Sequence, residues 1–289
     1  MDTTLNISTE AKSPKLFLSK NFKIYTETLK HLENLSFKSK SYLKNLTIKD
    51  ERIDNTLLEK YQFQCHGFAW FETYRIGLRE LVNWYKVLEK KEQNTDIDAS
   101  ILVFGFAEYI QQLKNGIMIS QTEIIRSNQL GLEDKDFSFF DASDFLEVLN
   151  FGLSDHVKFD IVRCLAEGLY PSLGLNDETL EMVQDQFKKF TDDEIIPHAN
   201  EWHLKDDLIP DSILEKMSEL GVFSIAIPEN YGGLGMGKVA MCVVTEELSR
   251  GFLAAESLGT RAEIAGELIR LGGTEEQKNK YLPKIASGE

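Results

Sequence analysis

Proline is almost absent from the first 170 residues of this sequence. After Pro14 the next proline is Pro171, and the whole chain of 289 residues has six. Because proline lacks an amide N–H and clashes with the preceding helical turn, a stretch without it permits long helices. Period-2 alternation, which is typical of half-buried strands, is scarce there. The sequence therefore predicts an all-α fold up to Pro171.

Apolar residues in this stretch recur at helical spacing. One pattern begins at Phe68, and others lie at residues 101–110 and 157–169. Asp141 and Ser143 are candidate N-caps of a short helix through Phe145. We interpret the aromatic stripes as the core of a helical bundle rather than as a cofactor site. The longest stripe consists of Phe68, Phe71, Tyr74, Leu78, Leu81, Tyr85 and Leu88.

The first 50 residues differ from the rest in charge. They contain nine lysines and five acidic residues, whereas the whole chain has a net charge of -15. Such a basic arm could touch an acidic partner or a membrane surface. Its residues Phe22, Tyr25, Leu29 and Leu32 fall at helical spacing, however, which favours a packed amphipathic helix. We predict a basic N-terminal helical arm over residues 1–50.

Proline and glycine interrupt the helical pattern at residues 171–174, and a new pattern begins behind Asn176, Asp177 and Glu178. We place a domain boundary there, which gives a helical extension domain over 51–172 and a second helical domain over 173–289. In the second domain we expect the first helix to end near Pro197. Pro210 precedes another short helix, and Gly221 has the position of a left-handed C-terminal cap.

The remainder of the second domain is also predicted to be helical. Residues 222–227 form a short apolar run that we expect to be extended. Helices are predicted over about 239–250 and 254–271, and Thr274 with Gln277 makes a capping-box pattern that opens a last helix.

A glycine-rich stretch at residues 232–238 matches the phosphate-binding pattern GxxxxGK. Val239 stands where that loop needs the serine or threonine hydroxyl that binds Mg²⁺. The same glycines approach the dinucleotide fingerprint, but no alternating βαβ pattern surrounds them. We therefore interpret the stretch as a tight connection in which glycine permits positive φ.

Composition excludes several other functions. The net charge of -15 argues against a nucleic-acid binder. No uninterrupted apolar run of about 18 residues and no signal-peptide core occur, so we expect a soluble, cytoplasmic protein without membrane contact. The three cysteines lie far apart, the five histidines have no metal-ligand spacing, and no GxSxG is present. No metal site and no nucleophile are therefore predicted.

Three stretches of the second domain resemble the N-terminal helical domain of the acyl-CoA dehydrogenases. An additional likeness is to a branch of that family with an extra N-terminal domain, through FAWF at 68–71, GFAEY at 105–109, ISQTEI at 119–124 and SLGTRAEI at 257–264. The family stretches are LGV at 220–222 leading to IPENYGGLG at 227–235, then TEELSR at 245–250, then GTEEQ at 273–277 leading to KYLP at 280–283.

The resemblance implies oxidation of an acyl-CoA thioester by FAD, with electrons passed to electron-transfer flavoprotein. It also implies a homodimer or homotetramer for the full-length enzyme. In the family a flavin-binding β domain and a second helical domain, which holds the catalytic glutamate, follow a segment like 280–289. We therefore expect this chain to be truncated before the β domain. No residue in it is assigned as catalytic base, as a principal FAD ligand or as a metal ligand.

In the family this helical domain helps to wall the acyl pocket. The substrate-side candidates that follow are Leu258, Gly259, Thr260, Arg261 and Glu263. Arg261 could hold the free carboxylate of a dicarboxylic acyl-CoA, because a guanidinium binds a carboxylate with two parallel hydrogen bonds. The alternative is an exposed arginine paired with Glu263 or Glu267.

Two other functions stay open. The chain could be a non-catalytic helical module for assembly or partner docking. Within the family, another short branched-chain or dicarboxylic acyl-CoA could be the substrate.

Overall fold

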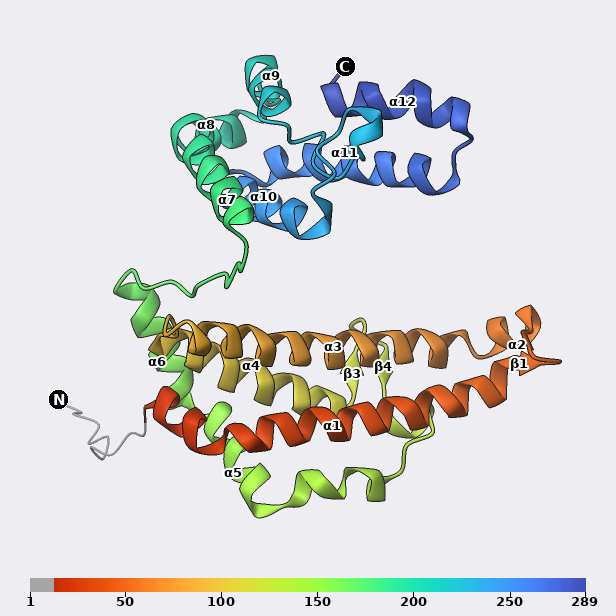
Figure 1. Ribbon diagram of the computed structural model, residues 1–289. Coiled ribbons are helices and arrows are strands. Elements are labelled where there is room, and N and C mark those ends of the chain that lie inside the picture. The colour runs from red at the N-terminus through yellow and green to blue at the C-terminus, as the bar shows by residue number, and fades with distance from the viewer. Residues whose placement is uncertain (1–12) are drawn as a thin grey trace. The chain divides into compact units, whose positions relative to one another are not determined.

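A computed structural model describes residues 13–289 of the chain. The start of the predicted arm, residues 1–12, lies outside the described residues. The chain divides into two compact units, unit 1 up to Gly174 and unit 2 from Leu175 to Glu289 (Figure 1). This division falls two residues after the boundary predicted from the sequence. Both units are helical, as the sequence predicted, with two short β-hairpins in unit 1 among the described residues.

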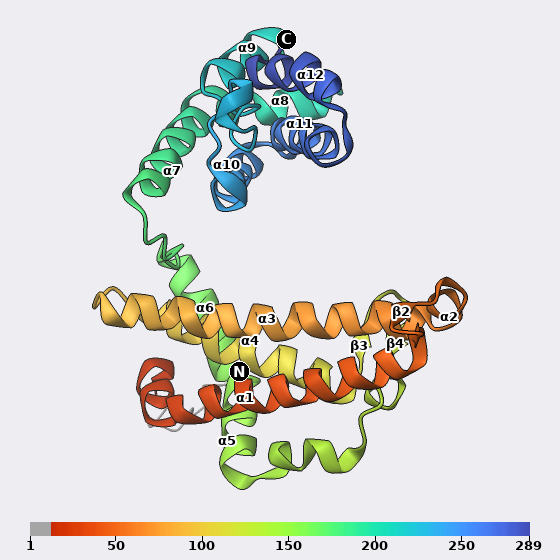
Figure 2. The same cartoon turned by 45° about the vertical axis from the view of Figure 1, so that its right-hand side comes forward.

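Unit 1 is a bundle in which the long helices lie side by side (Figures 1 and 2). Helix α4 (Asp96–Asn115) is central and packs against α1 (Pro14–Thr47), α3 (Gln62–Lys90), α5 (Ser143–Gly152) and α6 (Asp155–Ala166). The smaller elements are β1 (Ile48–Lys49), β2 (Arg52–Ile53), α2 (Asn55–Lys60), β3 (Ile117–Met118), β4 (Ile124–Ile125) and 3₁₀ turns at Ser127–Leu130 and Asp134–Asp141.

The predicted basic arm is part of this bundle. Helix α1 buries Tyr25 and Leu32 completely and packs against α3 and α4. The rings of Tyr25 and Phe106 lie 4.6 Å apart, so the arm contributes directly to the core. The structure therefore agrees with the packed alternative and places α1 inside unit 1 rather than in a segment of its own.

The aromatic stripe predicted from Phe68 lies on α3, where Phe71, Leu78 and Tyr85 are buried in the core. The predicted caps of α5 are wrong. That helix follows Ala142 without a side-chain cap, and Asp141 belongs to the preceding 3₁₀ turn. The Asp141 carboxylate instead pairs with Lys114 at 2.8 Å, a partner far away in sequence that no capping rule identifies.

Unit 2 is built around α10 (Gly237–Gly251), which packs against α7 (Glu178–Phe190) and α11 (Leu253–Gly272). Helix α12 (Glu275–Ser287) packs in turn against α11. The predicted caps Asp177 and Thr274 accept backbone N–H groups, and Gly221 has a φ of +83° just after the helix that ends at Glu219. The other elements are a π-helical turn at Thr191–Ile195, α8 (Ile196–Lys205), α9 (Asp211–Glu219) and a 3₁₀ turn at Glu229–Tyr231.

Two local predictions for unit 2 are wrong. The first helix does not end near Pro197, because the π-helical turn leads into α8 and Pro197 occupies its first turn, where no N–H is needed. Residues 222–227 are not extended but form consecutive turns, with hydrogen bonds from Ser224 N to Gly221 O and from Ile227 N to Ser224 O. Within the described part of the chain, no helix is both long and apolar enough to span a bilayer.

Candidate functional site

The five candidate residues lie on α11, but the structure distributes them around that helix. Leu258 packs against the core of unit 2, and Gly259 is buried. A Cβ on Gly259 would lie 2.9 Å from Cγ1 of Val222, so this glycine permits close contact with the turns at 222–227. Both residues therefore serve the internal packing of unit 2.

Two of the polar candidates, Thr260 and Glu263, have partners inside unit 2. The Thr260 hydroxyl donates to the Glu256 carboxylate one turn earlier. The Glu263 carboxylate accepts from the Lys238 ammonium of α10, which also lies 3.1 Å from Glu267. These carboxylates are thus already engaged by a cation of the same unit.

Arg261 is exposed and differs from its neighbours. Its side chain has no hydrogen bond or ion pair within residues 13–289, since Glu263 pairs with Lys238, and Glu267 pairs with Lys238 and Arg270. The alternative in which Arg261 pairs with Glu263 or Glu267 is therefore wrong for this structure. A residue two positions along a helix points to another side, which explains why Glu263 does not reach it.

An exposed apolar stripe runs along the same face of α11 as Arg261. Two of its residues are Ile264 and Leu268. Arg261 precedes them by three and seven residues, and this spacing places all three on one face of the helix. Exposed large apolar side chains that share one face of a helix are typical of an interaction site. We call these four residues the α11 stripe: Leu253, Ile264, Leu268 and Leu271, with exposed fractions of 69%, 53%, 69% and 73%.

The sequence predicted the α11 helix, but the α11 stripe was not predicted from it. A signal was present, because α11 carries apolar residues both on the side that packs and on the opposite side. A helix with apolar residues on two opposite sides can pack against a neighbour on each of them.

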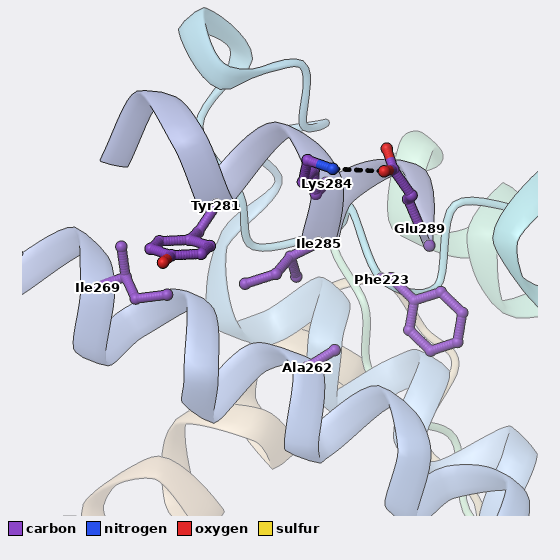
Figure 3. A pocket seen from close by; sticks show the side chains of 8 residues that line it. Phe223, Ala262, Ile269, Tyr281, Lys284, Ile285 and Glu289 are labelled. Atoms are coloured by element: carbon purple, nitrogen blue, oxygen red, sulfur yellow. Dashed lines mark hydrogen bonds and ion pairs between the residues drawn. The ribbon is translucent and has the colours of Figure 1, made fainter. Parts of the chain in front are cut away.

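A second apolar feature is a hollow of about 310 Å³ between α11 and α12 (Figure 3). Ala262 and Ile269 of α11 face Tyr281 and Ile285 of α12 across it, and Phe223 lies at one end. The charged residues at its edge, Lys284 and Glu289, pair with each other. The hollow therefore offers apolar contact and no free acid or base.

Backbone amides in the middle of the glycine-rich segment already donate to carbonyl groups of the chain. Gly233 N donates to Pro228 O, Gly235 N to Ile227 O, and Met236 N to Ile225 O. A Cβ on Gly233 would lie 2.0 Å from Ile227 O, so this glycine is needed for close backbone contact. These three amides are therefore not free to bind the phosphates of a nucleotide.

Several charged side chains around α11 are paired with one another. The hydrogen bond with Glu263 raises the pKa of the Lys238 ammonium, and the hydrogen bond from Arg270 is the main cause that lowers the pKa of the Glu267 carboxyl. No group of three or more His, Cys, Asp or Glu side chains suited to a metal occurs among the residues described. Lys238 and Arg270 thus both lie beside carboxylates of α11.

The family model for the acyl-CoA dehydrogenase N-terminal domain matches residues 177–289, which is nearly the whole of unit 2. Unit 2 is an acyl-CoA dehydrogenase N-terminal domain. The chain is 39% identical over 268 residues to (2S)-methylsuccinyl-CoA dehydrogenase from Cereibacter sphaeroides, covering 91% of this chain and 48% of that protein.

Other acyl-CoA dehydrogenases match a shorter part of the chain. Glutaryl-CoA dehydrogenase from Desulfococcus multivorans is 37% identical over 114 residues, covering 38% of this chain and 29% of that protein. Mitochondrial isovaleryl-CoA dehydrogenase from Arabidopsis thaliana is 38% identical over 117 residues, covering 40% and 29%. The chain thus spans about half the length of the first relative and less than a third of the other two.

Proposed function

We propose that this chain is the N-terminal part of an FAD-dependent acyl-CoA dehydrogenase that oxidises (2S)-methylsuccinyl-CoA to mesaconyl-CoA. The reaction would be a step of the ethylmalonyl-CoA pathway, and the enzyme would be cytoplasmic. The supporting observation is the extent of the first relative. A match over 91% of the chain must include most of unit 1, whereas unit 2 alone is about two fifths of the chain. The glutaryl-CoA and isovaleryl-CoA relatives match no more than that fraction.

The reaction removes two hydrogens from adjacent carbons of the thioester. A carboxylate takes the α proton, the β carbon loses a hydride, and a carbon–carbon double bond forms between them. Bound FAD would supply the acceptor for this hydride, and electron-transfer flavoprotein would be the partner that takes up the electrons. We place the flavin and the catalytic carboxylate outside these 289 residues. In support, the amides of Gly233, Gly235 and Met236 are bonded to backbone carbonyls, and the carboxylates of Glu263 and Glu267 are paired with Lys238.

The α11 stripe is the surface that we assign to contact with the rest of the enzyme. In this arrangement Arg261 lies on the covered face, free of internal carboxylate partners. A guanidinium in such a place can bind the terminal carboxylate of methylsuccinyl-CoA in a bidentate manner. Leu258, Gly259, Thr260 and Glu263 would support this wall from inside unit 2.

The test is a substrate panel on the full-length enzyme with an artificial electron acceptor. We expect Arg261→Ala to raise KM for methylsuccinyl-CoA by about 10- to 100-fold, the factor for charge-assisted hydrogen bonds, and KM for isovaleryl-CoA very little. Arg270→Ala is the matched control, because its guanidinium already pairs with Glu267 at 2.9 Å. If Arg261→Ala changed KM equally for both substrates, Arg261 would not bind the terminal carboxylate.

The alternative of a non-catalytic assembly module has its own test. If the proposal holds, the 289-residue chain purifies without yellow flavin absorbance and without dehydrogenase turnover, while the full-length gene product shows both. Stoichiometric FAD on the short chain would contradict our placement of the flavin. A full-length product without flavin and without activity on any acyl-CoA would favour the module.

A further inference from the structure

The segment from Pro171 to Gly174 has no helical or strand structure, yet side chains of unit 1 hold it. It follows α6 and leads towards α7, which begins at Glu178. The contacts that hold it come from two different helices, α3 and α4.

The first contact is made by a buried carboxylate. Asp98, in the first turn of α4, is completely inaccessible to solvent. Its Oδ2 accepts from Thr95 N at 2.8 Å and from Thr95 Oγ1 at 2.7 Å, and its Oδ1 accepts from Ser172 N at 3.2 Å. A carboxylate can be buried only when donors compensate for the lost water. The Ser172 amide is one of these three donors.

The second contact is made by an indole. Trp84 of α3 donates from Nε1 to the Ser172 carbonyl oxygen at 2.9 Å. Both backbone groups of Ser172 are therefore bonded to side chains, one from each helix.

Gly174 fits closely against the same indole. Its N–H donates to Ser172 Oγ at 3.1 Å, and its φ of +65° is a conformation that favours glycine. A Cβ at this position would lie 2.5 Å from Cδ1 of Trp84. A side chain here would push the segment away from Trp84.

The other end of the connection is fixed by a helix cap. The Asp177 carboxylate accepts from Thr179 N at 2.8 Å and Leu180 N at 3.1 Å, which anchors the start of α7. Between the two anchored ends, Leu175 and Asn176 make no hydrogen bond within residues 13–289.

We propose that Asp98 and Trp84 form a clamp that makes residues 171–174 a fixed part of unit 1. The joint between the two units is then confined to Leu175 and Asn176. Opening of the clamp lengthens the free connection back towards Pro171, and the reach and freedom of a connection grow with its length.

The test uses the 289-residue chain and two measurements on its backbone, amide hydrogen exchange and ¹H–¹⁵N heteronuclear NOE. In the unchanged chain we expect Ser172 and Gly174 to show NOE values like those of α3 and slow exchange, and Leu175 and Asn176 to show lower NOE values. Trp84→Phe should speed exchange at Ser172 by about fivefold, the factor that one hydrogen bond contributes. Trp70→Phe is the control, because its Nε1 bonds to His66 on the same helix.

Gly174→Ala provides a second test if Trp84→Phe fails to fold. It should speed exchange at Ser172 and extend the low NOE values back to Ser172, the first residue of the segment with an amide N–H. Gly168→Ala is its control, because Gly168 has a similar φ of +77° but nothing within 4 Å of a Cβ. Fast exchange at Ser172 in the unchanged chain would overturn the clamp. The clamp would also be overturned if the Ser172 amide exchanged at the same rate in each variant as in its control.

Discussion

Asp136 attaches the 3₁₀ turn at Asp134–Asp141 to α1. Its Oδ2 lies 2.5 Å from Lys38 Nζ and accepts the Glu133 backbone N–H at 2.8 Å. The hydrogen bond from Lys38, followed by that from Glu133, lowers the pKa of the Asp136 carboxyl. A carboxyl whose pKa is lower in the folded state stabilises the fold above its unfolded pKa, and this contribution is lost as the pH falls through the folded value.

Replacement of Lys38 should therefore have a pH-dependent effect. We expect Lys38→Met to lower the free energy of unfolding by at most about 1 kcal/mol at neutral pH, because the partly exposed lysine is screened by solvent. The difference should shrink as the pH falls below about 4 and the Asp136 carboxyl becomes protonated. Urea unfolding at a series of pH values measures it.

Lys23→Met serves as control, since Lys23 makes an exposed pair with Glu27 on α1 at 3.4 Å. It should change the free energy of unfolding very little at any pH. A Lys38→Met effect that stays constant down to strongly acidic pH would instead indicate lost packing of the lysine stem.

At the scale of elements, α5 approaches α4 closely at one glycine. A Cβ on Gly152 would lie 2.4 Å from the Val103 carbonyl oxygen and 2.7 Å from the Ala107 Cβ. We expect Gly152→Ala to lower the free energy of unfolding by about 1–3 kcal/mol, because one helix must move away from the other. Gly77→Ala on α3, with nothing within 4 Å, should raise it by up to about 1 kcal/mol. Thermal or urea unfolding that ranks them in the opposite order would contradict this packing.

The α11 stripe gives a second prediction for an element. Leu268→Ser should change the free energy of unfolding of the 289-residue chain by less than about 0.5 kcal/mol, because Leu268 is 69% exposed. It should also reduce self-association of this chain in analytical ultracentrifugation. Leu282→Ala on α12, whose side chain is fully buried, should cost about 2–5 kcal/mol. A large loss of stability from Leu268→Ser would show that the stripe belongs to the core of unit 2.

Helix starts and stops were predictable where a single residue determines them. Asp177, Gly221 and Thr274 act through groups one to three residues away, so their roles follow from local sequence. The path through Pro197 was not predictable, because a π-helical turn can precede a proline-started helix without any fixed residue signal. Residues 222–227 were predicted to be extended because they are mostly apolar. The buried turns that the structure has there are equally apolar, so composition does not distinguish the two.

The candidate site was predictable in position but not in partners. The resemblance indicated α11 and Arg261, and the sequence also offered Glu263 and Glu267 as nearby carboxylates. Only the packing of α10 beside α11 brings Lys238 to both of them and leaves Arg261 free. Contacts between helices decide this, and no spacing along one helix contains that information.

For the whole molecule, the important fact is that each unit has a core of its own. The core of unit 1 and the cores of unit 2 share no residue. We therefore expect two calorimetric transitions on heating, with Gly152→Ala lowering the midpoint of one and Leu282→Ala that of the other. A single transition that both variants lower equally would show that the units unfold as one.

The distribution of tryptophan gives the two units separate optical reporters. Of the three indoles in the sequence, Trp70 and Trp84 belong to α3 of unit 1, and Trp202 belongs to α8 of unit 2. Trp202 lies against His198, with ring centroids 5.6 Å apart, and against Phe252. A chain with phenylalanine at positions 70 and 84 would emit from Trp202 alone, so its intrinsic fluorescence would follow unit 2 without any attached dye.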